Sequence, residues 1–240
     1  MVGLGPGNWE QMTLRAQQVL AEAEVVTGYK TYIELIRANL TRPDQKIIAS
    51  GMTQEVDRCR EVAHMAQLGQ SVALVSSGDA GIYGMAGIML EVMAQAQLTI
   101  PIEVVPGVSA AAAAAACLGA PLMHDFVTVS LSDLLTPWEL IKKRVQLAAE
   151  GDFVLAIYNP KSKQRVNQIR EVQQILLQYK SAHTPVGIVR NALREGQEVR
   201  LSSLAAFTEE PIDMLTTVIV GNSQTKVVGD CMVTPRGYKL

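Results

Sequence analysis

The feature that most restricts the fold of this chain is an alternation of short β-branched runs with longer amphipathic segments. The apolar runs are EVVTG (24–28), KIIAS (46–50), SVALVSS (71–77), IEVVPG (102–107), DFVTVS (125–130), DFVLAIY (152–158), PVGIVRN (185–191) and TTVIVGN (216–222). Helical periodicity occupies residues 13–23, 54–69, 137–151 and 163–180, the last with basic residues in its final turn. Such alternation predicts an α/β fold with mainly parallel sheets.

An interruption near LGAPLMHD predicts two lobes. Gly119 and Pro121 end an alanine-rich helix just before a new strand begins. We therefore expect an N-terminal α/β lobe over 1–122 and a C-terminal α/β lobe over 123–240. A cleft between two lobes is the default place for a ligand.

Composition excludes several classes of function. The chain is 48% hydrophobic and 18% charged, as in globular proteins, and its net charge of -2 gives no support to nucleic-acid binding. Three scattered cysteines favour reduced thiols and a cytoplasmic location. Without C-x-x-C or H-x-x-x-H spacing we expect no metal site, and the longest small-apolar run (107–120) is too weakly hydrophobic to span a membrane.

The first glycine-rich loop, GLGPGNW (3–9), does not fit a phosphate site. Its spacing is G-x-G-x-G, and Pro6 has no N–H to offer a pyrophosphate. No acidic residue follows the second apolar run where a ribose-binding group would lie. A tight turn is the simpler interpretation.

A second glycine-rich stretch, GDAGIYGMAG (78–87), follows the buried-type strand 71–77. Asp79 then lies at the carboxyl end of that strand, where parallel sheets place ligands. Its carboxylate could accept hydrogen bonds from ribose hydroxyls or an amine, or it could cap the following helix. Two further sets of loops have the same ambiguity: VVPGVSA (104–110), where Ser109 opens the alanine helix, and the polar segments 157–165 and 187–197.

Taken in order, these blocks resemble the tetrapyrrole methylases, the methyltransferases of corrin and sirohaem synthesis. The resemblance rests on GLGPG, SSGDAGIYGMAG, VVPGVSA, YNPKSKQR, TPVGIVRNALREGQ and TTVIVGNSQT. GYKTY, GDAGIYG, SLSDLLTPW and YNPKSK are similar to the branch that methylates C-17 of precorrin-3B or cobalt-factor III.

The resemblance implies a two-lobed tetrapyrrole methylase fold, mainly parallel in the first lobe and mixed in the second. It also implies a homodimer that binds S-adenosyl-L-methionine and releases S-adenosyl-L-homocysteine. By matching motif, the cofactor-binding residues are Pro6, Gly78, Asp79, Ile82, Tyr83, Ser109, Ala110, Asn159, Ala192 and Thr216.

The implied reaction is methyl transfer to C-17 of a polycarboxylate tetrapyrrole, coupled to ring contraction, in cobalamin biosynthesis. No catalytic acid or base is evident; the candidates are Asp79, Lys30, Ser130 and Asp133. Cations expected to meet substrate carboxylates are Lys30, Lys161, Lys163, Arg190 and Arg194. The alternatives are a sister methyltransferase acting at C-11 or C-20 and, from another class, a non-catalytic nucleotide-binding module.

Overall fold

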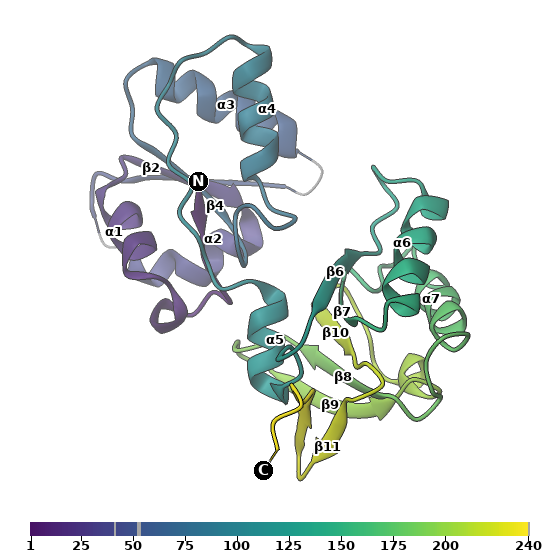
Figure 1. The fold of residues 1–240 in the computed structure, drawn as a ribbon. Helices are drawn as coiled ribbons and strands as arrows, with labels where there is room; N and C mark the ends of the chain where they lie inside the picture. The colour runs from purple at the N-terminus through teal and green to yellow at the C-terminus, as the bar shows by residue number, and fades with distance from the viewer. Residues whose placement is uncertain (41, 52–53, 240) are drawn as a thin grey trace. The chain divides into compact units, whose positions relative to one another are not determined.

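The computed structural model describes residues 1–40, 42–51 and 54–239, which form two compact units, Met1–Ala110 and Ala111–Leu240 (Figure 1). The sequence places the division after residue 122, whereas the units divide at Ala110. The reason is that the alanine-rich helix α5 (Ala110–Leu118) packs through Ala111, Ala114 and Leu118 against strands of the second unit.

The first unit is an α/β layer structure. Its strands are β1 (Val2–Gly3), β2 (Val25–Tyr29), β3 (Lys46–Ser50) and β4 (Val72–Ser76), all parallel, in the order β1-β4-β2-β3. Its helices are η1 (Trp9–Gln11), α1 (Leu14–Glu22), α2 (Lys30–Ile36), η2 (Arg37–Asn39), α3 (Glu55–Gln67) and α4 (Ala86–Gln95). The predicted parallel sheet of the first lobe is therefore confirmed.

Successive strand residues point to opposite faces of this sheet and feed two cores. Val25 and Leu74 pack with α3 and α4, whereas Val26 and Ala73 pack with α1 and α2. Figure 1 shows these two helix pairs on opposite faces of the sheet. Both faces are covered, which explains why the strands read as continuous apolar runs.

The second unit contains a five-stranded mixed sheet in the order β6-β7-β10-β8-β9 and a three-stranded sheet in the order β11-β12-β5. Its strands are β5 (Gly119–Ala120), β6 (Phe126–Ser130), β7 (Val154–Tyr158), β8 (Pro185–Arg190), β9 (Glu198–Ser203), β10 (Thr216–Val220), β11 (Lys226–Val228) and β12 (Cys231–Val233). Its other helices are α6 (Trp138–Glu150), α7 (Gln168–Leu176) and η3 (Phe207–Glu209). The mixed character predicted for this lobe is confirmed.

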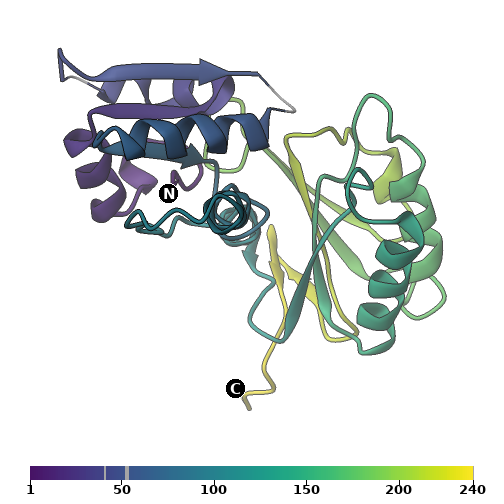
Figure 2. The same cartoon turned by 90° about the horizontal axis from the view of Figure 1, so that it is seen from above.

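Helices cover the two faces of the five-stranded sheet unequally. α6 and α7 pack on Leu155 and Ile157, and α5 packs on the other face, against Ala156 and Ile219. Figure 2 shows α6 and α7 side by side on one face of that sheet. The close approach of α5 explains Gly187, where a Cβ atom would lie 2.3 Å from the Leu118 side chain.

Two predicted elements differ from the structure. The run 102–107 forms only a single bridge, Val2 to Val105, because an exposed Pro106 and the following glycine end it. The helix predicted over 163–180 is shorter, since α7 spans Gln168–Leu176. Before α7 begins, Arg165 forms loop hydrogen bonds with Ser162 and Asn159. The predicted basic final turn lies beyond the C-terminal end of α7.

Candidate functional site

The first unit gathers its predicted site residues at one edge of the parallel sheet. Gly3 pairs with Ser76 and Gly28 pairs with Val75, so β1, β2 and β4 end at the same level. Pro6, Lys30 and Asp79 follow these strand ends. Ligands of parallel α/β sheets bind at this edge.

Three loops are fastened to one another at this edge. Gly5 and Gly78 exchange a pair of backbone hydrogen bonds of 3.0 and 2.8 Å. The Asp79 carboxylate accepts from Gly81 N–H through Oδ1 at 2.8 Å and from Gly107 N–H through Oδ2 at 3.0 Å. Asp79 therefore closes its own turn and ties it to the loop that precedes α5.

The glycines of these loops serve close backbone packing. A Cβ atom at Gly107 would lie 2.2 Å from the carbonyl oxygen of Gly78, and one at Gly3 would lie 2.7 Å from Gly107 N. Gly78 also has a φ of 64°, which favours glycine. Close packing of these loops against one another thus explains why they contain so many glycines.

Around Asp79 the surface is apolar and carries little charge. Ile82 and Tyr83 are 43% and 55% exposed, whereas Pro6 and Gly78 are buried and Ser109 and Ala110 are half-buried. Asp79 is the only ionisable carboxylate in loops 3–9, 76–86 and 104–110, which contain no lysine, arginine or histidine. These loops suit a ligand without phosphate groups and with a positive charge.

Sequence reasoning missed Arg58, an α3 residue that is only 4% exposed. Its guanidinium donates to Ser50 Oγ at 2.5 Å and to the Gly51 carbonyl at 2.6 Å, and Ser50 Oγ donates to the Gly28 carbonyl at 3.3 Å. Arg58 therefore fixes the carboxyl ends of β2 and β3. An arginine inside an amphipathic helix pattern gives no signal of this role.

The second unit also brings its candidates to one sheet edge. Ser130 pairs with Tyr158 across β6 and β7, and Thr216 pairs with Arg190 across β10 and β8. Since β10 runs antiparallel to β7 and β8, its start lies level with their ends. Asn159 and the half-buried Ala192 follow those ends directly.

Hydrogen bonds join the loops that follow β6 and β7. Asn159, with a φ of 49°, donates through Nδ2 to Ser130 Oγ at 3.0 Å, and its carbonyl accepts from Arg165 at 2.8 Å. Asp133 accepts from Gln168 at 2.9 Å and lies 3.8 Å from Arg165. Two acid–base candidates, Ser130 and Asp133, are thus engaged within the protein.

A second network surrounds Thr216, which is buried. Its hydroxyl donates to Asp213 Oδ1 at 2.9 Å, and Asp213 Oδ2 accepts from Arg190 at 2.8 Å. Burial alone would raise the pKa of Asp213, but hydrogen bonds from Arg190, Leu215 and Thr216 outweigh it and lower that pKa. Asp213 was missed by sequence reasoning, although its position three residues before a threonine is a local turn signal.

Arg190 therefore has its charge partners inside the unit. It also reaches Glu198 at 3.4 Å, and its hydrogen bond to Asp213 raises the pKa of the guanidinium. Lys30, Lys161 and Lys163, in contrast, have no hydrogen-bond or ion-pair partner among the residues that the structure describes.

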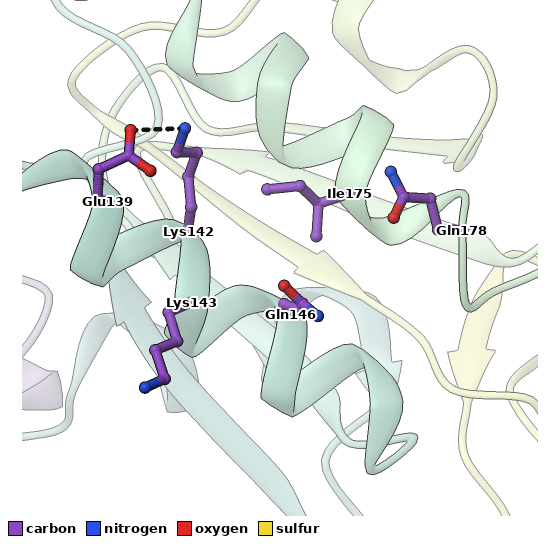
Figure 3. Close-up of a pocket in the computed structure, with 6 residues that line it drawn as sticks. All are labelled: Glu139, Lys142, Lys143, Gln146, Ile175 and Gln178. Carbon is purple, nitrogen blue, oxygen red and sulfur yellow. Dashed lines mark ion pairs between the residues drawn. The ribbon is translucent and has the colours of Figure 1, made fainter.

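A hollow of about 360 Å³ lies on the helical face of the second unit, between α6 and α7 (Figure 3). It is lined by Glu139, Lys142, Lys143, Gln146, Ile175 and Gln178. Glu139 and Lys142 form an ion pair of 2.7 Å across its rim. None of the residues predicted for the site lines this hollow.

Residues 1–40, 42–51 and 54–239 contain no group of three or more His, Cys, Asp or Glu side chains that could hold a metal ion. Within the same residues, no helix is both long and apolar enough to cross a membrane.

Comparison with known proteins identifies the family. The sequence profile of the tetrapyrrole (corrin/porphyrin) methylases matches residues 1–208. The chain belongs to the tetrapyrrole methylases. It is 48% identical to the "Probable cobalt-factor III C(17)-methyltransferase" of Salmonella typhimurium, over 100% of this chain and 99% of that protein.

Other methylases agree with this membership. A cobalt-factor III methyltransferase of Priestia megaterium is 51% identical over 100% of this chain, which spans only 45% of that longer protein. A precorrin-3B C(17)-methyltransferase of Sinorhizobium sp is 39% identical over 99% of this chain and 96% of its own. The crystal structure of the methyltransferase CobJ superposes with a TM-score of 0.91 at 36% identity, covering 98% of both chains.

Proposed function

We propose that this methylase transfers a methyl group from S-adenosylmethionine to C-17 of precorrin-3B or cobalt-factor III, with contraction of the macrocycle, in cobalamin biosynthesis. The observation that carries the proposal is the 48% identity to the Salmonella protein over both full lengths. The precorrin-3B C(17)-methyltransferase of Sinorhizobium supports the same position of methylation.

The loops of the first unit fit this methyl donor. S-Adenosylmethionine supplies a methyl group on a positively charged sulfur, and it has no phosphate. Asp79 is the one carboxylate of the three loops, and exposed Ile82 and Tyr83 offer apolar surface to an adenine ring. Residues proposed to hold the cofactor are Pro6, Gly78, Asp79, Ile82, Tyr83, Ser109, Ala110, Asn159, Ala192 and Thr216.

The hydrogen bonds indicate how some of these residues would act. The Thr216 hydroxyl and the Asn159 amide are already engaged with Asp213 and Ser130, so these two residues would meet a ligand through backbone atoms. The Asp79 carboxylate keeps lone pairs beyond the two used by Gly81 and Gly107, and these can accept from the cofactor.

Chemistry of this kind needs positioning more than an activated nucleophile. A carbon of the tetrapyrrole attacks, so the protein contributes alignment and exclusion of water. Asp79, Ser130 and Asp133 each hold loops together, which leaves Lys30 as the candidate with no partner among the described residues. Lys30 is exposed beside the end of β2, and we assign it to a substrate carboxylate.

We further propose a cytoplasmic homodimer that acts on a small molecule and binds neither nucleic acid nor membrane. Cys59, Cys117 and Cys231 are all free thiols, as expected in a reducing compartment. Light scattering of the purified protein tests the dimer.

The decisive experiment incubates the protein anaerobically with labelled S-adenosylmethionine and either metal-free precorrin-3B or cobalt-factor III. Mass spectrometry should detect one added methyl group, and NMR should place it on C-17 of a contracted ring. Methylation at C-11 or C-20 would contradict the assignment, and so would tight binding of ATP or NADPH in place of S-adenosylhomocysteine.

A further inference from the structure

Two consecutive leucines project into solvent from the loop between β6 and α6. Leu134 is 77% exposed and Leu135 is 91% exposed, the highest value among the large apolar side chains that the structure describes. The flanking residues are anchored: Leu131 is fully buried in the core, and Trp138 packs against the same core. Single exposed leucines are ordinary on protein surfaces. An adjacent exposed pair is unusual, and this pair lies at the sheet edge where the loops with the candidate site residues begin.

Hydrogen bonds hold the start of this loop in place. Leu131 N–H donates to the Tyr158 carbonyl at 2.9 Å, and Ser132 N–H donates to Ser130 Oγ at 3.2 Å. Asp133, directly before the leucines, accepts from Gln168 at 2.9 Å. The pair is therefore presented from a fixed position beside the end of β7.

Positive charge lies in the neighbouring loop 159–165, which is joined to the leucine loop by the Asn159–Ser130 hydrogen bond and the Arg165–Asp133 pair. Lys161 and Lys163 have no hydrogen-bond or ion-pair partner in the described part of the chain. Arg165 is nearly buried, its Nε atom has no hydrogen-bond partner, and its carboxylate neighbour Asp133 lies at 3.8 Å. The two joined loops thus carry three cations, Lys161, Lys163 and Arg165, and one anion, Asp133.

We propose that Leu134 and Leu135 form an apolar platform for one face of the tetrapyrrole ring, with Lys161 and Lys163 binding its peripheral carboxylates. This inference rests on the proposed function and deepens it. A flat apolar ring with acidic substituents complements a leucine pair beside unpaired ammonium groups. A second copy of the chain fits less well, because a stable dimer needs about 800 Å² per partner and two side chains offer far less.

The test measures tetrapyrrole binding apart from turnover. The chain has two tryptophans, so a Trp9→Phe background leaves Trp138, at the end of the leucine loop, as the fluorescent reporter. Uroporphyrin III, a stable octacarboxylate, is titrated against this protein and against its Leu134→Ala/Leu135→Ala variant. We expect the Kd to rise about 10- to 100-fold, in line with the apolar area lost.

A matched control removes two other strongly exposed leucines, from the first unit: Leu14 at 75% and Leu68 at 68%. Leu14→Ala/Leu68→Ala should bind the porphyrin as the parent does. Both double variants should bind S-adenosylhomocysteine in calorimetry with unchanged affinity. In turnover with cobalt-factor III, Leu134→Ala/Leu135→Ala should raise KM for the tetrapyrrole and leave kcat nearly unchanged.

Charge is tested separately by Lys161→Gln/Lys163→Gln, which should weaken porphyrin binding and flatten its dependence on salt. An unchanged salt dependence overturns the role of the lysines. If Leu134→Ala/Leu135→Ala changes the Kd for the porphyrin by less than twofold, the platform is overturned. A halved molecular mass of this variant in light scattering also overturns it, because the two leucines would then contact a second copy of the chain. A parent protein that binds porphyrin but methylates neither tetrapyrrole refutes the proposed function and leaves the platform standing.

Discussion

Replacing Asp79 by alanine should destabilise the first unit before any ligand is added. The substitution removes the acceptor of two backbone N–H groups, Gly81 at 2.8 Å and Gly107 at 3.0 Å. A hydrogen bond to a charged acceptor contributes about 1.5–3 kcal/mol, and partial exposure of Asp79 favours the low end. We therefore expect a loss of about 2–3 kcal/mol, or a Tm lower by roughly 8–12 °C for a unit of this size.

The assay needs a probe confined to the first unit. In a Trp138→Phe background the remaining tryptophan is Trp9, which packs against the core of that unit. Thermal unfolding followed by its fluorescence compares the parent with Asp79→Ala and Asp79→Asn. Asparagine keeps one acceptor but turns an amide donor toward the second N–H, so its loss should be about half.

Asp57→Ala is the control, because Asp57 is exposed and its carboxylate pairs with Arg60 at the surface. Its effect should stay below about 1 kcal/mol. If Asp79→Ala unfolds at the temperature of its parent while losing S-adenosylhomocysteine binding, Asp79 is a ligand contact only. A role of Asp79 in tying the loops together would then be refuted.

Three further outcomes are expected. Lys30→Ala should weaken binding of the tetrapyrrole and leave S-adenosylhomocysteine binding unchanged in titrations of both ligands. An unchanged tetrapyrrole affinity would contradict the assignment of Lys30 to a substrate carboxylate. Lys180 is a buried ammonium that donates to the Phe153 carbonyl at 3.0 Å and pairs with Asp152 at 3.1 Å, so Lys180→Met should cost about 2–4 kcal/mol in urea unfolding. Lys142→Met, which removes a surface pair, should leave the urea midpoint nearly unchanged. The pKa of Asp213 is lowered in the folded state, so the unfolded chain binds a proton at this carboxylate more readily than the folded chain does. The stability that the Asp213 carboxylate contributes is therefore complete above its unfolded pKa and is lost as pH falls through the lower folded pKa. Urea midpoints between pH 7 and pH 3 should therefore fall less steeply for Asp213→Asn, and identical slopes would contradict this.

Local patterning was enough to predict most strands and helices. The apolar runs became β2, β3, β4, β6, β7, β8 and β10. Helices on both sheet faces bury most of β2, β4, β7, β8 and β10, whereas β3 and β6 are only partly buried. It failed for β9, whose edge position lets charged residues such as Glu198 and Arg200 occupy the strand and hide the apolar signal.

Contacts between residues distant in the chain could not be predicted in this way. The bond from Gly107 to Asp79 spans 28 residues, and Asn159 reaches Ser130 across 29. Sequence reasoning placed Asp79, Ser130 and Asn159 at strand ends, in agreement with the sheet registers, whereas the run before Gly107 forms only a single bridge. Their partners depend on how neighbouring loops pack, and no periodicity carries that information.

The loop contacts bear on how a ligand would bind at the sheet edge of the first unit. Gly5 and Gly78 exchange backbone hydrogen bonds, and the Asp79 carboxylate is oriented by the N–H groups of Gly81 and Gly107. Because a carboxylate has about four lone-pair positions, this arrangement leaves acceptors aimed from a fixed place. A ligand that uses them need not order the loops, and that saved entropy appears as affinity. The glycines would therefore contribute to ligand binding indirectly, by letting three loops pack closely enough for Asp79 to be held.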